Sequence, residues 1–408
     1  MPGYLKLRMT SQCGHYIGMS TGATEPFQTT PLPVDEFPIL EHGLYANHAA
    51  IAPWPLSAAN AVAAFAAENA AMAAQKYSRW LLRETRLREA LGELLNAESA
   101  HDIALLKNTT DGICTVANGV DWRKGDNLVL PADEFPSNRL PWLALERLGV
   151  EVREVDIRAT MEPEQALLGR IDERTRVLAV SAVQWTDGLR LKLEILGRHC
   201  RQNDVLFFVD AIQQLGALQM DVQACGIDCL AADGHKWLLA PEGIAVFYCR
   251  DVWRDRLQLQ QLGWHMVDEP YQFDRAQWQP DKSATRFEAG SPNMLGQVAM
   301  HASVTLLRDF GMPRVETLIT ENSRVLSAAL AEMPGVVLSQ PFDKDRVSGI
   351  VTFKTPQADQ PAIYRELLNR GLVCALRGGG IRLSPHFYQA GEPVKAMLEL
   401  IDEVIKLN

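Results

Sequence analysis

The chain has 408 residues, of which 47% are hydrophobic and 22% charged, and its formal net charge is −10. This is ordinary globular composition, long enough for one large domain and a smaller one. Acidic and basic residues are mixed along the sequence, which excludes a basic nucleic-acid surface and a disordered acidic tail and favours a small-molecule substrate.

The N-terminal segment 1–30 contains prolines and no long apolar core, and we expect a loose arm. No stretch of the chain is apolar enough to predict a signal peptide or a membrane span. Seven scattered cysteines, an odd number, favour a reducing cytoplasm. Cys225 and Cys229 have three residues between them, but no second pair follows at zinc-site spacing, so we expect no metal.

Short apolar strands that alternate with helices predict a large α/β domain over 31–292. Residues 58–96 have helical patterning and are expected to form two helices, the second beginning near residue 79. Further helices are expected at 138–148 and 191–203. Strands are expected at 103–106, 127–130, 150–155, 177–183, 205–209, 229–232 and 244–248. This alternation is typical of a mostly parallel sheet between helices, which binds ligands at the carboxyl ends of its strands.

After about residue 293 the pattern changes and predicts a small C-terminal α+β domain, 293–408. Its helices are expected at 294–310, 313–332, 360–370 and 393–407, and its strands at 336–340, 349–353, 372–375 and 381–384.

Two polar clusters stand at the ends of neighbouring predicted strands. Asp210 directly follows the apolar run 205–209, and Lys236 follows 229–232. Taken singly, a helix-capping aspartate and a solvated lysine are the commoner interpretations. Taken together, they would present an acid and a desolvated amine to one crevice. Pyridoxal phosphate needs such a pair, a Schiff-base lysine and an aspartate for its pyridinium nitrogen.

A third cluster, Thr109 and Thr110, follows the strand 103–106 and opens a helical segment. Hydroxyl groups and free backbone amides at a helix start suit a phosphate group. A simple helix cap explains the same residues equally well.

The ordered set Asp210-x-x-Gln213 and Gly234-His235-Lys236 resembles the class V aminotransferase family of fold-type-I pyridoxal-phosphate enzymes. This family includes cysteine desulfurases, kynureninases and isopenicillin N epimerase-like proteins. The resemblance extends from Asn47 to Phe387. It implies a fold-type-I transferase fold with a seven-stranded sheet, pyridoxal 5'-phosphate as cofactor, and a homodimer with shared active sites.

The resemblance also implies a role for individual residues. Cofactor contacts are expected from Thr109, Thr110 and His235 at the phosphate, Phe135 stacked on the pyridine ring, Gln213 at the phenolic oxygen, Asp210 at the ring nitrogen and Lys236 at the aldehyde. Ser291 is expected to reach the phosphate of the neighbouring subunit. Arg382 and Asn47 are expected to bind substrate, Arg382 through the planar fork that suits a carboxylate; a surface arginine is the alternative.

Three positions depart from the family pattern. Asp233 replaces a serine that contacts the phosphate, and we expect it to point away or to bond to backbone. Trp185 falls where desulfurases place an asparagine, for which Gln184 is a candidate substitute. Cys374 stands eight residues before Arg382 in an apolar run, where a thiol is inert. The intervening segment is too short for the mobile cysteine loop of desulfurases, so ordinary cysteine desulfurisation is not expected.

These residues predict an enzyme that acts on an amino acid or amine through an external aldimine, with Lys236 and Asp210 as its catalytic residues. Transamination is the first expectation. Epimerisation and β-elimination of the C–S lyase type share its first proton transfer and remain alternatives, and a non-catalytic binding protein of the same fold is the non-enzyme alternative.

Overall fold

The computed structural model describes residues 31–340 and 343–407. Pro33–Asn408 forms one compact unit. The arm expected at 1–30 lies outside the described residues, and so does Cys13. Among the helices that the structure describes, none combines the length and the apolar character needed to cross a membrane.

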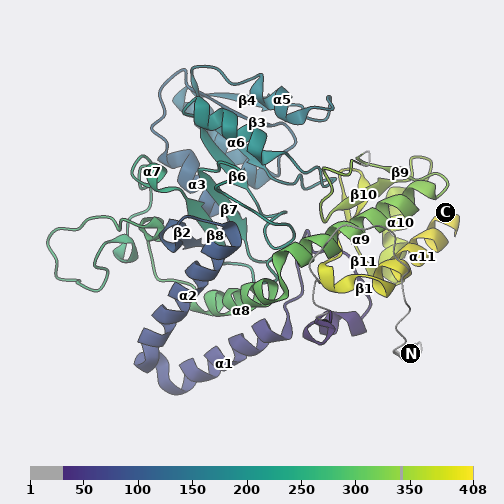
Figure 1. Ribbon diagram of the computed structural model, residues 1–408, viewed down its shortest axis with the longest axis horizontal. Helices are drawn as coiled ribbons and strands as arrows, with labels where there is room; N and C mark the ends of the chain where they lie inside the picture. Colours follow the sequence, from purple (N-terminus) through teal and green to yellow (C-terminus); the bar gives the residue numbers. More distant parts are fainter. Residues whose placement is uncertain (1–30, 341–342, 408) are drawn as a thin grey trace, which may run out of the picture. The chain divides into compact units, whose positions relative to one another are not determined.

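A seven-stranded sheet forms the centre of the larger part (Figure 1), in the order β2-β8-β7-β6-β5-β3-β4. Its strands are β2 (Ile103–Leu106), β3 (Asn127–Pro131), β4 (Glu151–Val155), β5 (Thr175–Ser181), β6 (Leu206–Asp210), β7 (Cys229–Asp233) and β8 (Ala245–Cys249). β8 runs antiparallel to both of its neighbours, and the other adjacent strands are parallel. All seven predicted strands and the mostly parallel sheet are confirmed.

Helices cover this sheet and bury its apolar strands. They include α3 (Thr109–Gly119), α4 (Leu140–Leu143), α5 (Pro163–Leu168), α6 (Leu193–Gln202) and α7 (Asp251–Arg254). α3 packs closely on β7, because a Cβ atom at Gly112 would lie 2.7 Å from the Ala231 Cβ. The apolar core of this part includes Val116, Leu128, Trp142, Phe208 and Phe247. The sheet is therefore a rigid base for the residues at its strand ends.

The single helix expected over 138–148 is wrong. The chain instead forms a 3₁₀ turn (Pro136–Asn138), the short α4, and a second 3₁₀ segment (Ala144–Leu148). Pro136 and Pro141 lack backbone N–H groups, so a continuous α-helix loses hydrogen bonds at this point.

The predicted N-terminal helices are confirmed as α1 (Leu56–Met72) and α2 (Tyr77–Leu95). Both pack against α8 (Met294–Phe310), which leads into the long helix α9 (Met312–Glu332). α8 lies beside the larger sheet and α9 continues to the C-terminal part (Figure 1). The N-terminal helices α1 and α2 thus pack against α8, and the chain continues from α8 through α9 into the C-terminal part.

The C-terminal part is built on a small sheet in the order β12-β13-β10-β9. Its elements are β9 (Val337–Leu338), β10 (Val351–Lys354), α10 (Gln360–Asn369), β12 (Ala375–Arg377), β13 (Gly380–Leu383) and α11 (Glu392–Leu407). β1 (Leu44–Tyr45) pairs in parallel with β11 (Leu372–Val373). A second apolar core includes Ala46, Leu326, Phe353, Ile381 and Met397. The segment around residue 45 therefore packs with the C-terminal elements.

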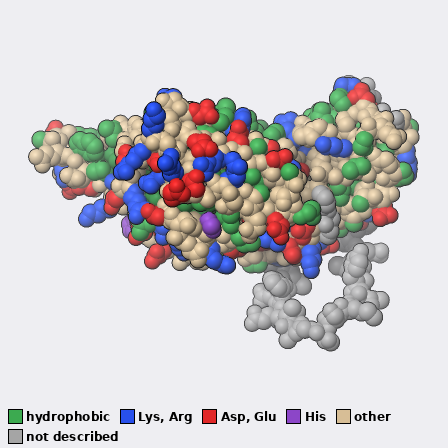
Figure 2. Space-filling model, turned by 90° about the horizontal axis from the view of Figure 1, so that it is seen from above, with side chains coloured by type: hydrophobic (Ala, Val, Ile, Leu, Met, Phe, Trp, Pro, Cys, Tyr) green, Lys and Arg blue, Asp and Glu red, His purple; other side chains and the backbone are tan. Residues whose placement is uncertain are grey.

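Basic and acidic side chains are interspersed over the face of the molecule shown in Figure 2. That face carries no basic stripe of the kind that binds nucleic acid.

Candidate active site

A cavity of about 320 Å³ lies at the carboxyl ends of β6 and β7. It is lined by the predicted site residues Thr109, Thr110, Phe135, Asp210, Gln213, His235, Lys236 and Arg382. Residues that the sequence did not mark for this site also line it, among them Asn108, Ser137, Glu242 and Arg377. Parallel strands deliver their last side chains to one edge of a sheet, which explains why these distant residues meet.

Asp210 and Lys236 face the cavity from adjacent strand ends. Asp210 is 2% exposed, and its Oδ1 accepts a hydrogen bond of 3.0 Å from the Ile212 amide. Burial raises the pKa of Asp210 to about 6, against the lowering effects of that amide and of Lys236. Burial lowers the pKa of Lys236 to about 8, while the charge of Asp210 opposes this shift. Lys236 therefore has an accessible neutral, nucleophilic form near neutral pH.

An aromatic ring, that of Phe135, lies beside the lysine amine. The Lys236 Nζ lies 5.6 Å from the centroid of the Phe135 ring. Phe135 in turn packs edge-on against Trp185, with 5.4 Å between ring centroids. Phe135 remains 41% exposed, so a flat face is available to a planar ligand. The Phe135 ring therefore borders the cavity beside the Lys236 amine.

The threonine turn forms the N-terminus of α3. Asn108 caps this helix by accepting a hydrogen bond of 2.9 Å from the Asp111 amide. The Thr110 hydroxyl donates to the Ser137 hydroxyl at 2.9 Å. Within the described residues, the amides of Thr109 and Thr110 have no hydrogen-bond acceptor. Free amides at the positive end of a helix suit an anion such as a phosphate group.

Asp233, expected to point away from the phosphate or to bond to backbone, lies in the wall of the cavity. Its backbone amide donates to the Thr109 hydroxyl at 2.9 Å. Its carboxylate lies 2.9 Å from the His235 Nδ1, and both side chains line the cavity. The turn after β7 therefore leaves the Asp233 carboxylate beside the imidazole of His235.

Gln213 is held firmly at the edge of the cavity. Its Nε2 donates to the Ala49 carbonyl at 3.0 Å, and its Oε1 accepts from the Trp237 indole at 3.0 Å. One Nε2 hydrogen of Gln213 is left without an acceptor among these contacts.

A buried carboxylate that the sequence did not reveal, Glu134, directly precedes Phe135 in the chain. Glu134 accepts hydrogen bonds from the Ser181 amide at 2.6 Å and from the Gln184 Nε2 at 3.1 Å. Burial raises the pKa of Glu134 to about 7, and Asp210 adds to this shift. Gln184 is fully buried and does not line the cavity. Glu134 and Gln184 therefore fix the strand end that presents Phe135.

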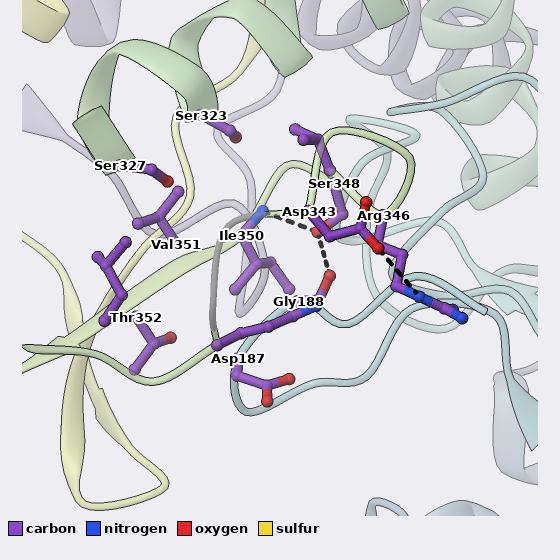
Figure 3. Close-up of a pocket in the computed structure, with 13 residues that line it drawn as sticks. Asp187, Gly188, Ser323, Ser327, Asp343, Arg346, Ser348, Ile350, Val351 and Thr352 are labelled. Atoms are coloured by element: carbon purple, nitrogen blue, oxygen red, sulfur yellow. Dashed lines mark hydrogen bonds and ion pairs between the residues drawn. The ribbon is translucent and has the colours of Figure 1, made fainter. Parts of the chain in front are cut away.

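The loop that carries Trp185 is clamped by the C-terminal part. The Arg382 Nη1 donates to the Trp185 carbonyl at 2.7 Å, and the Thr352 hydroxyl donates to the Thr186 carbonyl at 2.7 Å. The Ser348 hydroxyl donates to the Gly188 carbonyl at 2.7 Å, as Figure 3 shows. Three hydrogen bonds thus set the position of this cavity wall.

Two predicted residues do not line the cavity. Ser291 is exposed, just before α8. The Asn47 Oδ1 is buried without a hydrogen-bond partner among the described residues.

Cys374 is buried as expected, and burial raises the pKa of its thiol to about 12. Within the described residues, no cysteine lines the cavity.

The cavity has the features that a phosphorylated, aldehyde-bearing pyridine requires. Asp210 keeps one carboxylate oxygen without a hydrogen bond from any described residue, and the amides of Thr109 and Thr110 are similarly free. Lys236 and Phe135 line the same cavity, with 5.6 Å between the Lys236 Nζ and the Phe135 ring centroid. The donor set therefore fits pyridoxal phosphate.

Comparisons with known proteins agree with this chemistry. A family model described as aminotransferase class-V matches residues 45–393. A probable cysteine desulfurase of Methanothermobacter thermautotrophicus is 28% identical over 392 residues, which cover 90% of this chain and 96% of that protein. A probable cysteine desulfurase of Pyrococcus abyssi is 27% identical over 356 residues, covering 82% and 84% of the two chains.

Solved structures share the fold. The cystine C–S lyase C-DES in complex with its reaction product cysteine persulfide superposes with a TM-score of 0.82 at 24% identity. The match covers 90% of this chain and 99% of that chain. The apo cysteine desulfurase of Thermococcus onnurineus NA1 gives a TM-score of 0.81 at 21% identity, covering 93% and 99%.

Proposed function

The chain belongs to the class V aminotransferase family of pyridoxal-phosphate enzymes, and on that premise we propose that it is a lyase that cleaves the C–S bond of a cysteine-type amino acid. The observation that carries this proposal is the joint presence of Lys236, Asp210 and Arg382 in one cavity whose described lining contains no thiol. Elimination needs a base at the α-carbon but no sulfur acceptor on the protein.

Each of the three residues has a separate task in this proposal. When bound, the cofactor withdraws electrons from the substrate α-carbon. Asp210 holds the proton on the ring nitrogen, and Arg382 holds the substrate carboxylate. The neutral Lys236 amine, favoured by burial, removes the α-proton. The C–S electron pair then leaves with the sulfur, and hydrolysis of the remaining three-carbon product yields pyruvate and ammonia.

The buried position of Cys374 supports elimination without a protein persulfide. The hairpin β12–β13 turns at Gly378 and Gly379, whose φ values are +57° and +71°. Such a tight turn has no room for a mobile loop with a reactive cysteine. The thiolate is the reactive form of cysteine, and the raised pKa of Cys374 suppresses it.

The relatives support a sulfur-containing substrate. Two of them are called probable cysteine desulfurases, and a structure of the same fold is that of a cystine C–S lyase. Transamination, the first expectation from the sequence, uses the same Lys236 and Asp210. No contact in the described site favours it over elimination, and the experiment below separates the two.

The decisive experiment incubates the holoenzyme with L-cysteine, L-cystine and S-alkyl cysteines. A lyase releases pyruvate and ammonia in equal amounts together with a thiol, persulfide or sulfide, and the cofactor returns to its aldehyde form. A transaminase instead converts the cofactor to its amine form and needs a keto acid to turn over. Stoichiometric conversion to the amine form without sulfur release would refute the lyase.

We further propose that the enzyme is a cytoplasmic homodimer. Ser291 is exposed and does not line the cavity of its own chain, which fits a residue that serves a second copy. The segment between α7 and α8 extends away from the sheet in Figure 1 and exposes Leu262, Phe273 and Trp278. Exposed apolar groups of this kind are typical of an interface. Free thiols at the six described cysteines fit a reducing compartment.

A further inference from the structure

Two arginines project from one face of the β12–β13 hairpin into the cavity. Ala375 and Arg382 are cross-strand partners, so their side chains share a face of the hairpin. Arg377 lies two residues beyond Ala375 and therefore shares that face. Both arginines line the same cavity as Lys236. Arg382 is 2% exposed, whereas Arg377 is exposed beside the turn.

The buried arginine of this pair differs from the other buried arginines of the described chain. Arg88 pairs with Glu288 at 2.5 Å, and Arg346 pairs with Glu164 at 2.7 Å. Arg382 has no carboxylate partner among the described residues: its Nη1 donates to the Trp185 carbonyl at 2.7 Å, and its Nε is buried without a hydrogen bond. A buried guanidinium without an anionic partner is costly. Its missing partner is therefore expected from a ligand.

Arg377 also forms no ion pair with a carboxylate among the described residues. Its Nη1 donates to the Leu376 carbonyl at 2.9 Å. Burial lowers the pKa of Arg382 to about 10, and the nearby charge of Arg377 contributes. Both arginines also lower the pKa of Lys236, Arg382 more strongly. The two cations are therefore close enough to repel each other.

One carboxylate satisfies one guanidinium fork through two parallel hydrogen bonds. The proposed function uses Arg382 for the α-carboxylate, and a monocarboxylate substrate leaves Arg377 uncompensated. We infer that Arg377 binds a second anionic group, carried by the substrate side chain. The substrate class is then an acidic cysteine derivative, whose sulfur substituent bears a carboxylate or a similar oxyanion. This inference rests on the proposed function for the assignment of Arg382.

A binding experiment tests the inference without any reaction. Titration calorimetry of the holoenzyme compares glutarate with pentanoate, which have five carbons each and differ by one carboxylate. We expect glutarate to bind roughly 10- to 100-fold more tightly, because a charge-assisted hydrogen bond contributes in that range. Arg377→Gln should abolish this preference and Arg377→Lys should retain part of it.

The matched control is Arg365→Gln, which removes an exposed arginine of α10 outside the cavity. It should keep the full preference for glutarate. Equal binding of the two acids by the unmodified enzyme, or a preference for glutarate that survives Arg377→Gln, overturns the inference.

The proposed function is tested separately with S-(2-carboxyethyl)cysteine and S-butylcysteine. Release of a thiol and pyruvate from either compound supports the lyase, whatever the calorimetry shows. A glutarate preference that depends on Arg377, without thiol release from either compound, supports the anion site and contradicts the lyase.

Discussion

Lys236 and Asp210 line one cavity without forming an ion pair, yet each changes the pKa of the other. Burial acts on the two groups in opposite directions: it raises the pKa of the acid and lowers that of the amine. A direct ion pair would hold both groups in their charged forms. The separation instead leaves room for a planar ligand that binds the amine at one end and the acid at the other.

The raised pKa of Asp210 predicts a pH-dependent stability of the apoprotein. Its ordinary value is 3.8 and its folded value about 6. The folded state therefore binds more protons between these values, and Asp210's contribution to the free energy of unfolding falls as pH rises from about 4 to 6. The shift corresponds to roughly 3 kcal/mol. Denaturant unfolding of the apoprotein at several pH values measures it.

Asp210→Asn should remove most of this loss of stability between pH 4 and 6. Because the Asp210 charge also raises the pKa of Glu134, the variant should lose part of the pH dependence up to about pH 7 as well. An unchanged pH profile in the variant would show that Asp210 is ordinarily solvated.

Lys236→Ala should remove the covalent attachment of the cofactor. We expect the purified variant to lose the imine that borohydride reduces and to lose activity by about 10²- to 10⁴-fold, the usual contribution of a positioned base. The measurements are mass spectrometry after borohydride treatment and steady-state kinetics. Lys354→Ala, on β10 outside the cavity, is the control and should retain both properties.

Cys374→Ala should leave C–S cleavage within about twofold of the unmodified enzyme, because the buried thiol takes no part in the proposed reaction. In the unmodified folded protein, the Cys374 thiol should also resist alkylation, since burial raises its pKa to about 12. Peptide mapping after brief treatment with iodoacetamide measures this. Loss of cleavage in the variant, together with alkylation of Cys374 in the unmodified protein, would support a mechanism with a persulfide on Cys374.

Ser291→Ala should weaken cofactor binding although Ser291 does not line its own cavity. Loss of a hydrogen bond to a charged phosphate predicts a dissociation constant roughly 10- to 100-fold higher. Titration of the apoprotein with pyridoxal phosphate measures it, and Ser78→Ala on the exposed side of α2 is the control. An unchanged constant in a protein that sedimentation shows to be dimeric would remove Ser291 from the site.

The sequence predicted the residues at the strand ends better than the residues whose contacts depend on how the hairpin and the turns fold. Asp210 and Lys236 follow buried apolar runs, and the parallel order of such strands places their ends together. Arg377 was missed because only the register of the β12–β13 hairpin puts it on the face of Arg382. The partner of Asp233 depends on the turn after β7, whose local geometry has no simple sequence pattern.

A substitution at Gly188 tests whether the hydrogen bonds that hold the Trp185 loop also shape the cavity. Its φ of +83° lies in the left-handed region, and an added Cβ atom would stand 2.5 Å from the Ile350 carbonyl oxygen. Gly335 has a similar φ of +78°, but a Cβ there meets nothing within 4 Å. Gly335→Ala therefore isolates the backbone strain, about 1–2 kcal/mol.

Gly188→Ala should cost about 1–3 kcal/mol more than Gly335→Ala in denaturant unfolding, because it combines the same strain with overpacking. Relief of the clash must move the loop away from Ile350, which disrupts the Ser348 hydrogen bond to the Gly188 carbonyl. Trp185 then shifts against Phe135, so the variant should also bind glutarate more weakly, whereas Gly335→Ala should not. Equal losses of stability in the two variants would show that the clamp is not a rigid part of the site.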